Sequence, residues 1–225
     1  NISNNFLKEE LILNNIKMSR EQLKLINYFN NEFINNDPSG NLSKLDNYEG
    51  RLSWYISKKL EALINIQALY KKNLISLNKS YDLVGIINQY IGNILESHEK
   101  VENKSGWSTK QYSKDKNTKL YVSVDNSTIF YPLLLSINSD LINDENTKKN
   151  ILSLFELFFD QHEKNFLHKK NVYIINNDNF PYKGIEPLNF QSQFGLCLIE
   201  AYKATKNKKY LDKISEYLKN YENFN

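Results

Sequence analysis

Apolar residues recur with helical spacing along the C-terminal part of the chain, on both sides of a short polar turn. The turn is Thr205–Asn207. Pro187 can open the first helix, because a residue in the first turn needs no N–H donor. This pattern predicts a hairpin of two antiparallel helices. Its apolar positions are Phe190, Phe194, Cys197, Leu198, Ala201 and Tyr202, then Tyr210, Leu211, Ile214, Tyr217, Leu218 and Tyr221.

The same periodicity predicts helices in most of the remaining chain. We expect them over residues 5–35, 48–72 and 81–99, from about 128 onward with Pro132 in the first turn, and over 145–167. Two segments break the pattern, 100–128 and 170–186. In the first of them, Leu120–Asp125 alternates between apolar and polar residues, which predicts a short strand near residues 119–125.

These elements together predict an all-α fold of antiparallel helical hairpins with one short β element. We expect a single helical domain over residues 1–225, in which 1–47 form N-terminal helices and 48–225 form the hairpins. We also expect the two irregular segments to cap the same end of the hairpins. Repeated helical hairpins stack into solenoids or close into toroids.

Composition narrows the classes of partner. The net charge is +3, and the only arginines are Arg20 and Arg51. We expect no nucleic-acid binding, because arginine is the preferred reader of phosphates and bases. No apolar run reaches the length of a membrane span, so we expect none. The single cysteine, Cys197, excludes a disulfide within the chain and a cysteine-based zinc site, and its apolar helix face predicts burial.

Two stretches of the chain resemble proteins of the (α/α)-toroid class. One is the C-terminal hairpin, with Pro187–Gln191, Gly195, Ala201–Lys206 and Tyr210-Leu211. The other runs from Gly106-Trp107 through Tyr112 and Val124–Ser127 to Tyr131–Leu133. The resemblance is to the C-terminal region of D-glucuronyl C5-epimerases and related polysaccharide lyases, over about the latter two-thirds of the chain. It implies a partial or reduced toroid and an acidic polysaccharide as the ligand.

No metal or cofactor motif is present. His98, His162 and His168 are far apart and lack the spacing of a helical metal site, so we expect them at the surface. The chain has neither a G-x-S-x-G nucleophile motif nor a glycine-rich phosphate loop. We therefore expect no cofactor and no metal.

Carboxylates and tyrosines are the remaining candidates for proton transfer. The carboxylates at helix starts or in loops are Asp125, Asp178, Glu186 and Glu200. A simpler role for Asp125 is to cap a helix. A tyrosine can pass a proton when its pKa is tuned. The candidate catalytic residues are Tyr131, Asp125 and Tyr182.

The candidate ligand-binding residues lie in or beside the two irregular segments. They are Trp107, Tyr112, Tyr121, Asn189 and Glu186. We expect the aromatic residues to line one groove, where Trp107 could stack on a sugar ring. The alternative is that these aromatic residues fill the end of a helical bundle.

Three functions fit the sequence, and the third is a helical-repeat scaffold for peptide partners. The first is a carbohydrate-associated protein that binds or acts on an acidic polysaccharide, as a lyase, epimerase or hydrolase. The second is a non-enzymatic helical interaction module of the cell envelope or secreted space. A secreted or envelope location is favoured over the cytoplasm, and the oligomeric state is open.

Overall fold

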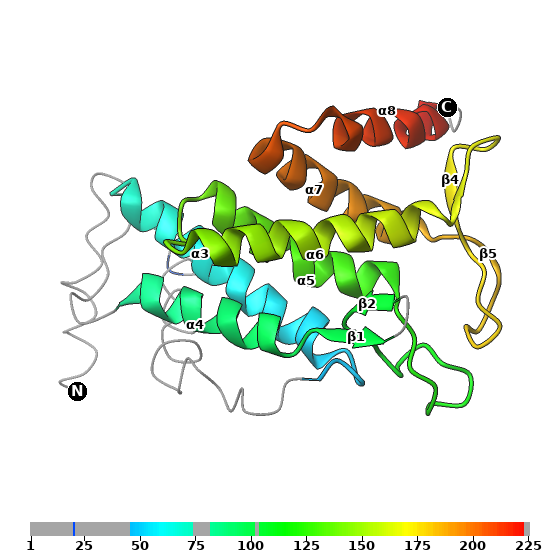
Figure 1. Ribbon diagram of the computed structural model, residues 1–225, viewed down its shortest axis with the longest axis horizontal. Coiled ribbons are helices and arrows are strands. Elements are labelled where there is room, and N and C mark those ends of the chain that lie inside the picture. The colour runs from blue at the N-terminus through cyan, green and yellow to red at the C-terminus, as the bar shows by residue number, and fades with distance from the viewer. Residues whose placement is uncertain (1–19, 21–45, 74–81, 102–103, 223–225) are drawn as a thin grey trace.

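The structure is a computed structural model that describes residues 20, 46–73, 82–101 and 104–222 (Figure 1). The N-terminal helices predicted for residues 1–47 lie almost wholly outside the described residues. The remainder is mostly helical, with a few short antiparallel strands. Its helices are η3 (Leu52–Ile56, a π-helical turn), α3 (Ser57–Lys71), α4 (Leu83–Glu96), α5 (Ser123–Asn138), α6 (Glu145–Glu163), α7 (Leu188–Thr205) and α8 (Lys208–Glu222).

Each long helix coincides with a segment of helical periodicity, which confirms the predicted helical character. Consecutive helices pack as pairs, α3 with α4, α5 with α6, and α7 with α8. The first helices of these pairs also pack side by side, with α5 between α3 and α7. Helix α5 is therefore the centre of the core, and most of its residues from Ser123 to Ser136 are buried.

Short strands gather near the ends of α4, α6 and α7 (Figure 1). Strand β1 (Glu99–Val101) pairs with β2 (Lys104–Gly106), and both follow α4. Strand β4 (Val172–Ile175) pairs on one side with β3 (Phe166–Leu167) and on the other with β5 (Gly184–Ile185). All of these pairings are antiparallel.

The strand predicted near residues 119–125 is wrong. Only Leu120 makes a β-bridge, to Thr109, and α5 already begins at Ser123. Leu120, Val122 and Val124 are buried in a small apolar cluster, but Ser123 and Asp125 are buried as well, so burial does not alternate. Because the helix begins earlier than predicted, Pro132 lies inside α5 rather than in its first turn.

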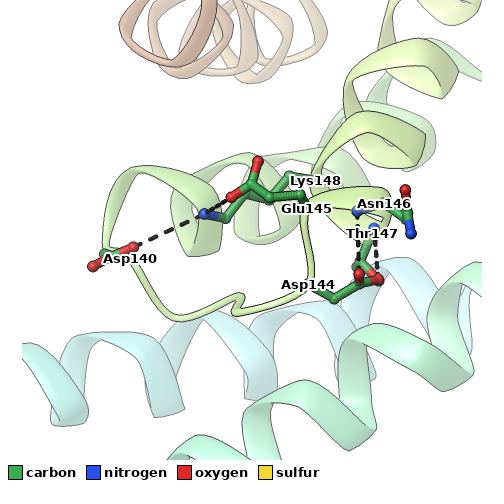
Figure 2. A network of polar contacts seen from close by, with 6 residues as sticks. All are labelled: Asp140, Asp144, Glu145, Asn146, Thr147 and Lys148. Atoms are coloured by element: carbon green, nitrogen blue, oxygen red, sulfur yellow. Dashed lines mark hydrogen bonds and ion pairs between the residues drawn. The ribbon is translucent and has the colours of Figure 1, made fainter.

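The connection between α5 and α6 is fixed by side chains at the start of α6 (Figure 2). Asp144 accepts hydrogen bonds from the backbone N–H groups of Asn146 and Thr147, which satisfies donors that a helix start leaves free. Lys148 forms ion pairs with Glu145 and Asp140. This cap sets where α6 begins, and the far end of α6 then carries His162 to the strands.

Cys197 lies in the core between α5 and α7. Its side chain is fully buried, and Sγ–H donates to the backbone carbonyl of Ser127 at 3.0 Å. Burial raises the pKa of this thiol well above its ordinary value. The predicted burial of Cys197 is confirmed, and the raised pKa keeps the thiol protonated and unreactive.

Candidate functional site

A pocket of about 360 Å³ lies where the two irregular segments meet the ends of α5 and α6. The segments are joined there, since the N–H of Lys114 donates to the carbonyl of Asn179 at 2.9 Å. This contact confirms that they cap the same end of the helices. The polar residues lining the pocket are Lys104, Ser105, Tyr121, Ser123, Asn126, Gln161, His162, Lys164, Asn165, Asn176, Asn177 and Glu186.

Glu186 lies in the pocket wall, just before α7. Its N–H donates to the carbonyl of Tyr173 in β4 at 2.9 Å, and its carbonyl accepts from Nε2 of Gln191 at 2.9 Å. In the side chain, Oε1 accepts a hydrogen bond of 2.8 Å from Oγ of Ser123, the first residue of α5. Backbone and side chain are thus held by three separate elements.

His162 reaches the same wall from the last turn of α6. Its ring stacks on Tyr173 with centroids 4.1 Å apart and meets Phe194 edge to face at 4.6 Å. Phe158, one helical turn earlier, stacks on it at 6.0 Å. The expectation of a surface position for His162 is wrong, because the residue is only 5% exposed.

Nε2 of His162 and Oε2 of Glu186 face each other at 3.5 Å. Neither atom has a hydrogen-bond partner among the described residues. Desolvation raises the pKa of Glu186 to about 8, against a lowering contribution from Ser123. Desolvation, with a smaller contribution from Lys213, lowers the pKa of His162 to about 3. At neutral pH the two shifts favour a carboxylic acid beside a neutral imidazole.

Several groups in the pocket wall are free to meet a ligand. The amines of Lys104 and Lys164 form no ion pair, and the side chains of Asn165 and Asn176 form no hydrogen bond, within the part of the chain that the structure describes. The amine of Lys104 lies over the ring of Tyr121, 5.9 Å from its centroid. The buried hydroxyl of Tyr121 likewise has no described partner. The wall therefore combines cationic and amide donors with aromatic surface from Phe158, Phe180 and Phe190.

Four of the predicted site residues gather at or beside this pocket. Tyr121 and Glu186 line it directly. Tyr112 stacks on Phe180, a lining residue, with centroids 5.8 Å apart, and Tyr182 meets the same ring edge to face at 5.2 Å. Glu186 and burial both raise the pKa of Tyr182, and burial is the larger cause.

The other predicted ligand-binding residues lie elsewhere. Trp107 is 1% exposed in the main core, where its ring contacts Phe130 and His98 edge to face. Its indole N–H donates to the carbonyl of Ile94 at 3.1 Å. Asn189 borders a shallow hollow on α7. A groove shared by all of the predicted aromatic residues is therefore not formed.

Tyr131 and Asp125, two of the predicted catalytic residues, do not line the pocket. Tyr131 lies on α5, and its pKa is raised by burial and by the nearby carboxylates of Glu61 and Glu200. The carboxylate of Glu200 already has partners, because it accepts a hydrogen bond of 2.7 Å from Nδ2 of Asn138 and forms an ion pair with Lys203.

Asp125 is fully buried in the first turn of α5. Its Oδ2 accepts a hydrogen bond of 3.0 Å from Nδ2 of Asn47, and desolvation raises its pKa to about 6. The predicted capping role is wrong, because no side chain caps α5. The remaining candidate carboxylate, Asp178, is exposed and pairs with Lys183.

Sequence reasoning missed His162 and Ser123. A signal for His162 was present, because it follows the buried Phe155, Phe158 and Phe159 at helical spacing on the inner face of α6. Ser123 carried no such signal, since its role depends on a partner 63 residues away.

No cluster of three metal-ligating side chains occurs among the residues that the structure describes. Over the same residues, no helix has the length and apolar character needed to cross a membrane. Comparisons with protein-family models, curated proteins and solved structures give no match. Function is therefore argued from the pocket itself.

Proposed function

We propose that the protein is carbohydrate-associated and binds an acidic sugar unit in the pocket beside Glu186. The supporting observation is the pocket wall, where the unpaired amines of Lys104 and Lys164 accompany free amide groups and aromatic rings. Lysine attracts carboxylates as a point charge, and amides pair with hydroxyl groups. Aromatic faces pack on the apolar faces of sugar rings.

The start of α5 adds to the preference for an anion. Val122 and Ser123 are part of the pocket wall, and a helix N-terminus carries partial positive charge. A neutral Glu186 does not repel a carboxylate at neutral pH, because its proton is retained up to about pH 8. A pocket of about 360 Å³ suits one or two sugar units, so a third unit of a longer ligand would extend out of it.

The arrangement of the helix pairs is compatible with a partial (α/α) toroid. In such a fold, the first helices of successive hairpins lie in an inner row and the second helices in an outer row. The packing of α5 between α3 and α7 supports this arrangement, with α4, α6 and α8 as the outer row.

Binding can be tested with trigalacturonate and, as a neutral match, maltotriose, by isothermal titration calorimetry on the whole chain. We expect only the acidic sugar to bind. The double variant Lys104→Gln and Lys164→Gln should weaken binding at least about tenfold, the loss of roughly 1.4 kcal/mol. Lys208→Gln, an exposed lysine of α8 outside the pocket, serves as the control. Equal affinity for both sugars would overturn the proposal.

Catalysis is tested with longer acidic polysaccharides. A lyase would release unsaturated products that absorb ultraviolet light, a hydrolase would release reducing ends, and an epimerase would exchange a carbon-bound proton with deuterated water. Binding without any of these three signals would identify a carbohydrate-binding module without catalysis.

A non-enzymatic interaction module is the second candidate, and the outer face of α7 favours it. Leu188, Leu196 and Ile199 are 58%, 42% and 39% exposed there. They share one face of the helix, on which the exposed Ser192 separates Leu188 from Leu196, and this face is called the stripe below. Replacement of all three by Gln should leave sugar binding intact, and it should abolish self-association in sedimentation experiments if this stripe is an interaction surface.

A further inference from the structure

Glu186 and His162 form a contact inside the pocket that leaves both side chains incompletely satisfied. Their facing atoms lie 3.5 Å apart, and the two side chains are 5% and 4% exposed. A hydrogen bond between oxygen and nitrogen normally falls below about 3.2 Å, so the contact is long and weak. Buried polar atoms without a partner are uncommon in proteins and indicate a missing ligand, a water or a catalytic role.

The surroundings decide where the proton of this pair resides. An ionised pair would place two charges against Phe158, Tyr173 and Phe194, and burial of charges carries a large desolvation cost. Ser123 donates to Oε1 of Glu186, which makes Oε1 the acceptor oxygen of the carboxyl group. The remaining oxygen, Oε2, can then carry the proton and direct it toward the imidazole.

We propose that Glu186 is a specificity-determining residue that, as a carboxylic acid, donates its Oε2–H to an acceptor oxygen of the ligand, with Ser123 and His162 as positioning residues. The inference rests on the proposed function for the identity of the ligand. In the free pocket the proton is directed at His162 over the long contact. Both facing atoms are enclosed in the pocket wall, so ligand binding must turn the Glu186 carboxyl from His162 toward the cavity. There, a ligand oxygen at normal hydrogen-bond distance replaces the weak contact with a stronger one.

Glu186 can donate this hydrogen bond only while its carboxyl group is protonated. As the pH rises through about 8, Glu186 loses its proton, can no longer donate, and places a negative charge beside an anionic ligand. The other titratable groups around it are His162 from α6, Tyr182 from the preceding loop and Tyr173 from β4, together with Lys104 and Lys164 of the pocket wall. Desolvation, with a smaller contribution from Lys213 of α8, lowers the pKa of His162 and keeps its imidazole neutral over this range.

The first test is the pH dependence of trigalacturonate affinity. For the natural chain, the affinity should fall about tenfold for each pH unit above the point where Glu186 ionises. Glu186→Gln keeps a neutral donor and an acceptor for Ser123, so its affinity should be retained at about pH 9. Glu200→Gln, which changes a buried carboxylate outside the pocket, should behave as the natural chain.

The second test needs no ligand. Carbon-13 NMR of the glutamate carboxyl carbons, with Glu186 assigned by its absence in Glu186→Gln, should show a protonated acid at neutral pH. An ionised Glu186 at neutral pH, or identical pH profiles for the natural chain and Glu186→Gln, would overturn the inference while trigalacturonate binding stood. Absence of trigalacturonate binding, with a protonated Glu186, would instead refute the proposed function and the ligand contact that depends on it.

Discussion

The side-chain amide of Asn47 donates a hydrogen bond of 3.0 Å to the buried carboxylate of Asp125, which lies 78 residues further along the chain. Oδ1 of Asn47 in turn accepts from the N–H and the hydroxyl of Ser53, at 2.9 and 3.1 Å. This network joins the π-helical turn η3 to the start of α5. It therefore links the N-terminal side of the described chain to the central helix.

Asn47→Ala should lower the free energy of unfolding by about 1–3 kcal/mol, because it leaves a buried carboxylate without its donor. Chemical denaturation at neutral pH measures the loss. Asn47→Asp keeps an acceptor for Ser53, but it replaces the donor to Asp125 with a second carboxylate, so it should cost at least as much. If Asn47→Asp were as stable as the natural chain, the bond to Asp125 would contribute nothing.

The buried pair in the pocket should shape the dependence of stability on pH. The pKa of Glu186 is raised from 4.5 to about 8, so the folded state binds a proton that the unfolded state has released, and stability falls as the pH rises through this range. The pKa of His162 is lowered from 6.5 to about 3, so its contribution to stability is lost as the pH falls below 6.5. The two effects oppose each other where the ranges overlap.

Above pH 6.5, the ordinary pKa of histidine, His162 no longer contributes to the pH dependence of stability, and of the two residues only Glu186 does. We therefore expect stability to fall between pH 6.5 and about 8, and Glu186→Gln to flatten that part of the profile. Denaturant midpoints measured across this range test the expectation. The same fall in Glu186→Gln as in the natural chain would assign the dependence to another group.

Gly106 occupies a backbone conformation that a side chain would strain, with φ of 146°. An added Cβ would also collide with Oδ1 of Asn126, the atom that accepts from the N–H of Trp107 at 2.9 Å. Gly106→Ala should therefore destabilise the fold by several kcal/mol, on the order of 2–4. Gly92→Ala in α4 is the control, since nothing lies within 4 Å of its added Cβ. It should be neutral or stabilising by up to about 1 kcal/mol.

Trp107 should affect stability much more than ligand binding. Trp107→Ala should cost about 3–5 kcal/mol as a large truncation in the core. Trp107→Phe keeps an aromatic ring and loses the indole N–H, which donates to the carbonyl of Ile94 and to Oγ of Ser97, so it should cost about 1 kcal/mol. Thermal unfolding measures both changes. Loss of trigalacturonate binding in a fully folded Trp107→Phe would show instead that the indole reaches the ligand.

The sequence by itself determined the helical elements and the character of their inner faces. Apolar residues at helical spacing identified α7 and α8 as a hairpin, and they placed Cys197 correctly in the core. Such patterns are local, because a helix repeats every 3.6 residues and its buried face must repeat with it. The irregular segments were recognised by the absence of the same pattern.

Only the tertiary structure decided where α5 begins and which polar groups meet. Residues 119–125 alternate between apolar and polar types as a strand would, yet α5 begins at Ser123. In this first turn, the side chain of Asn126 forms hydrogen bonds with the backbone of Trp107, a contact between residues far apart in sequence. His162 and Glu186 each resemble an ordinary polar residue in sequence. Their unusual protonation arises chiefly from burial by segments distant in the chain, which the spacing of residues along one element does not encode.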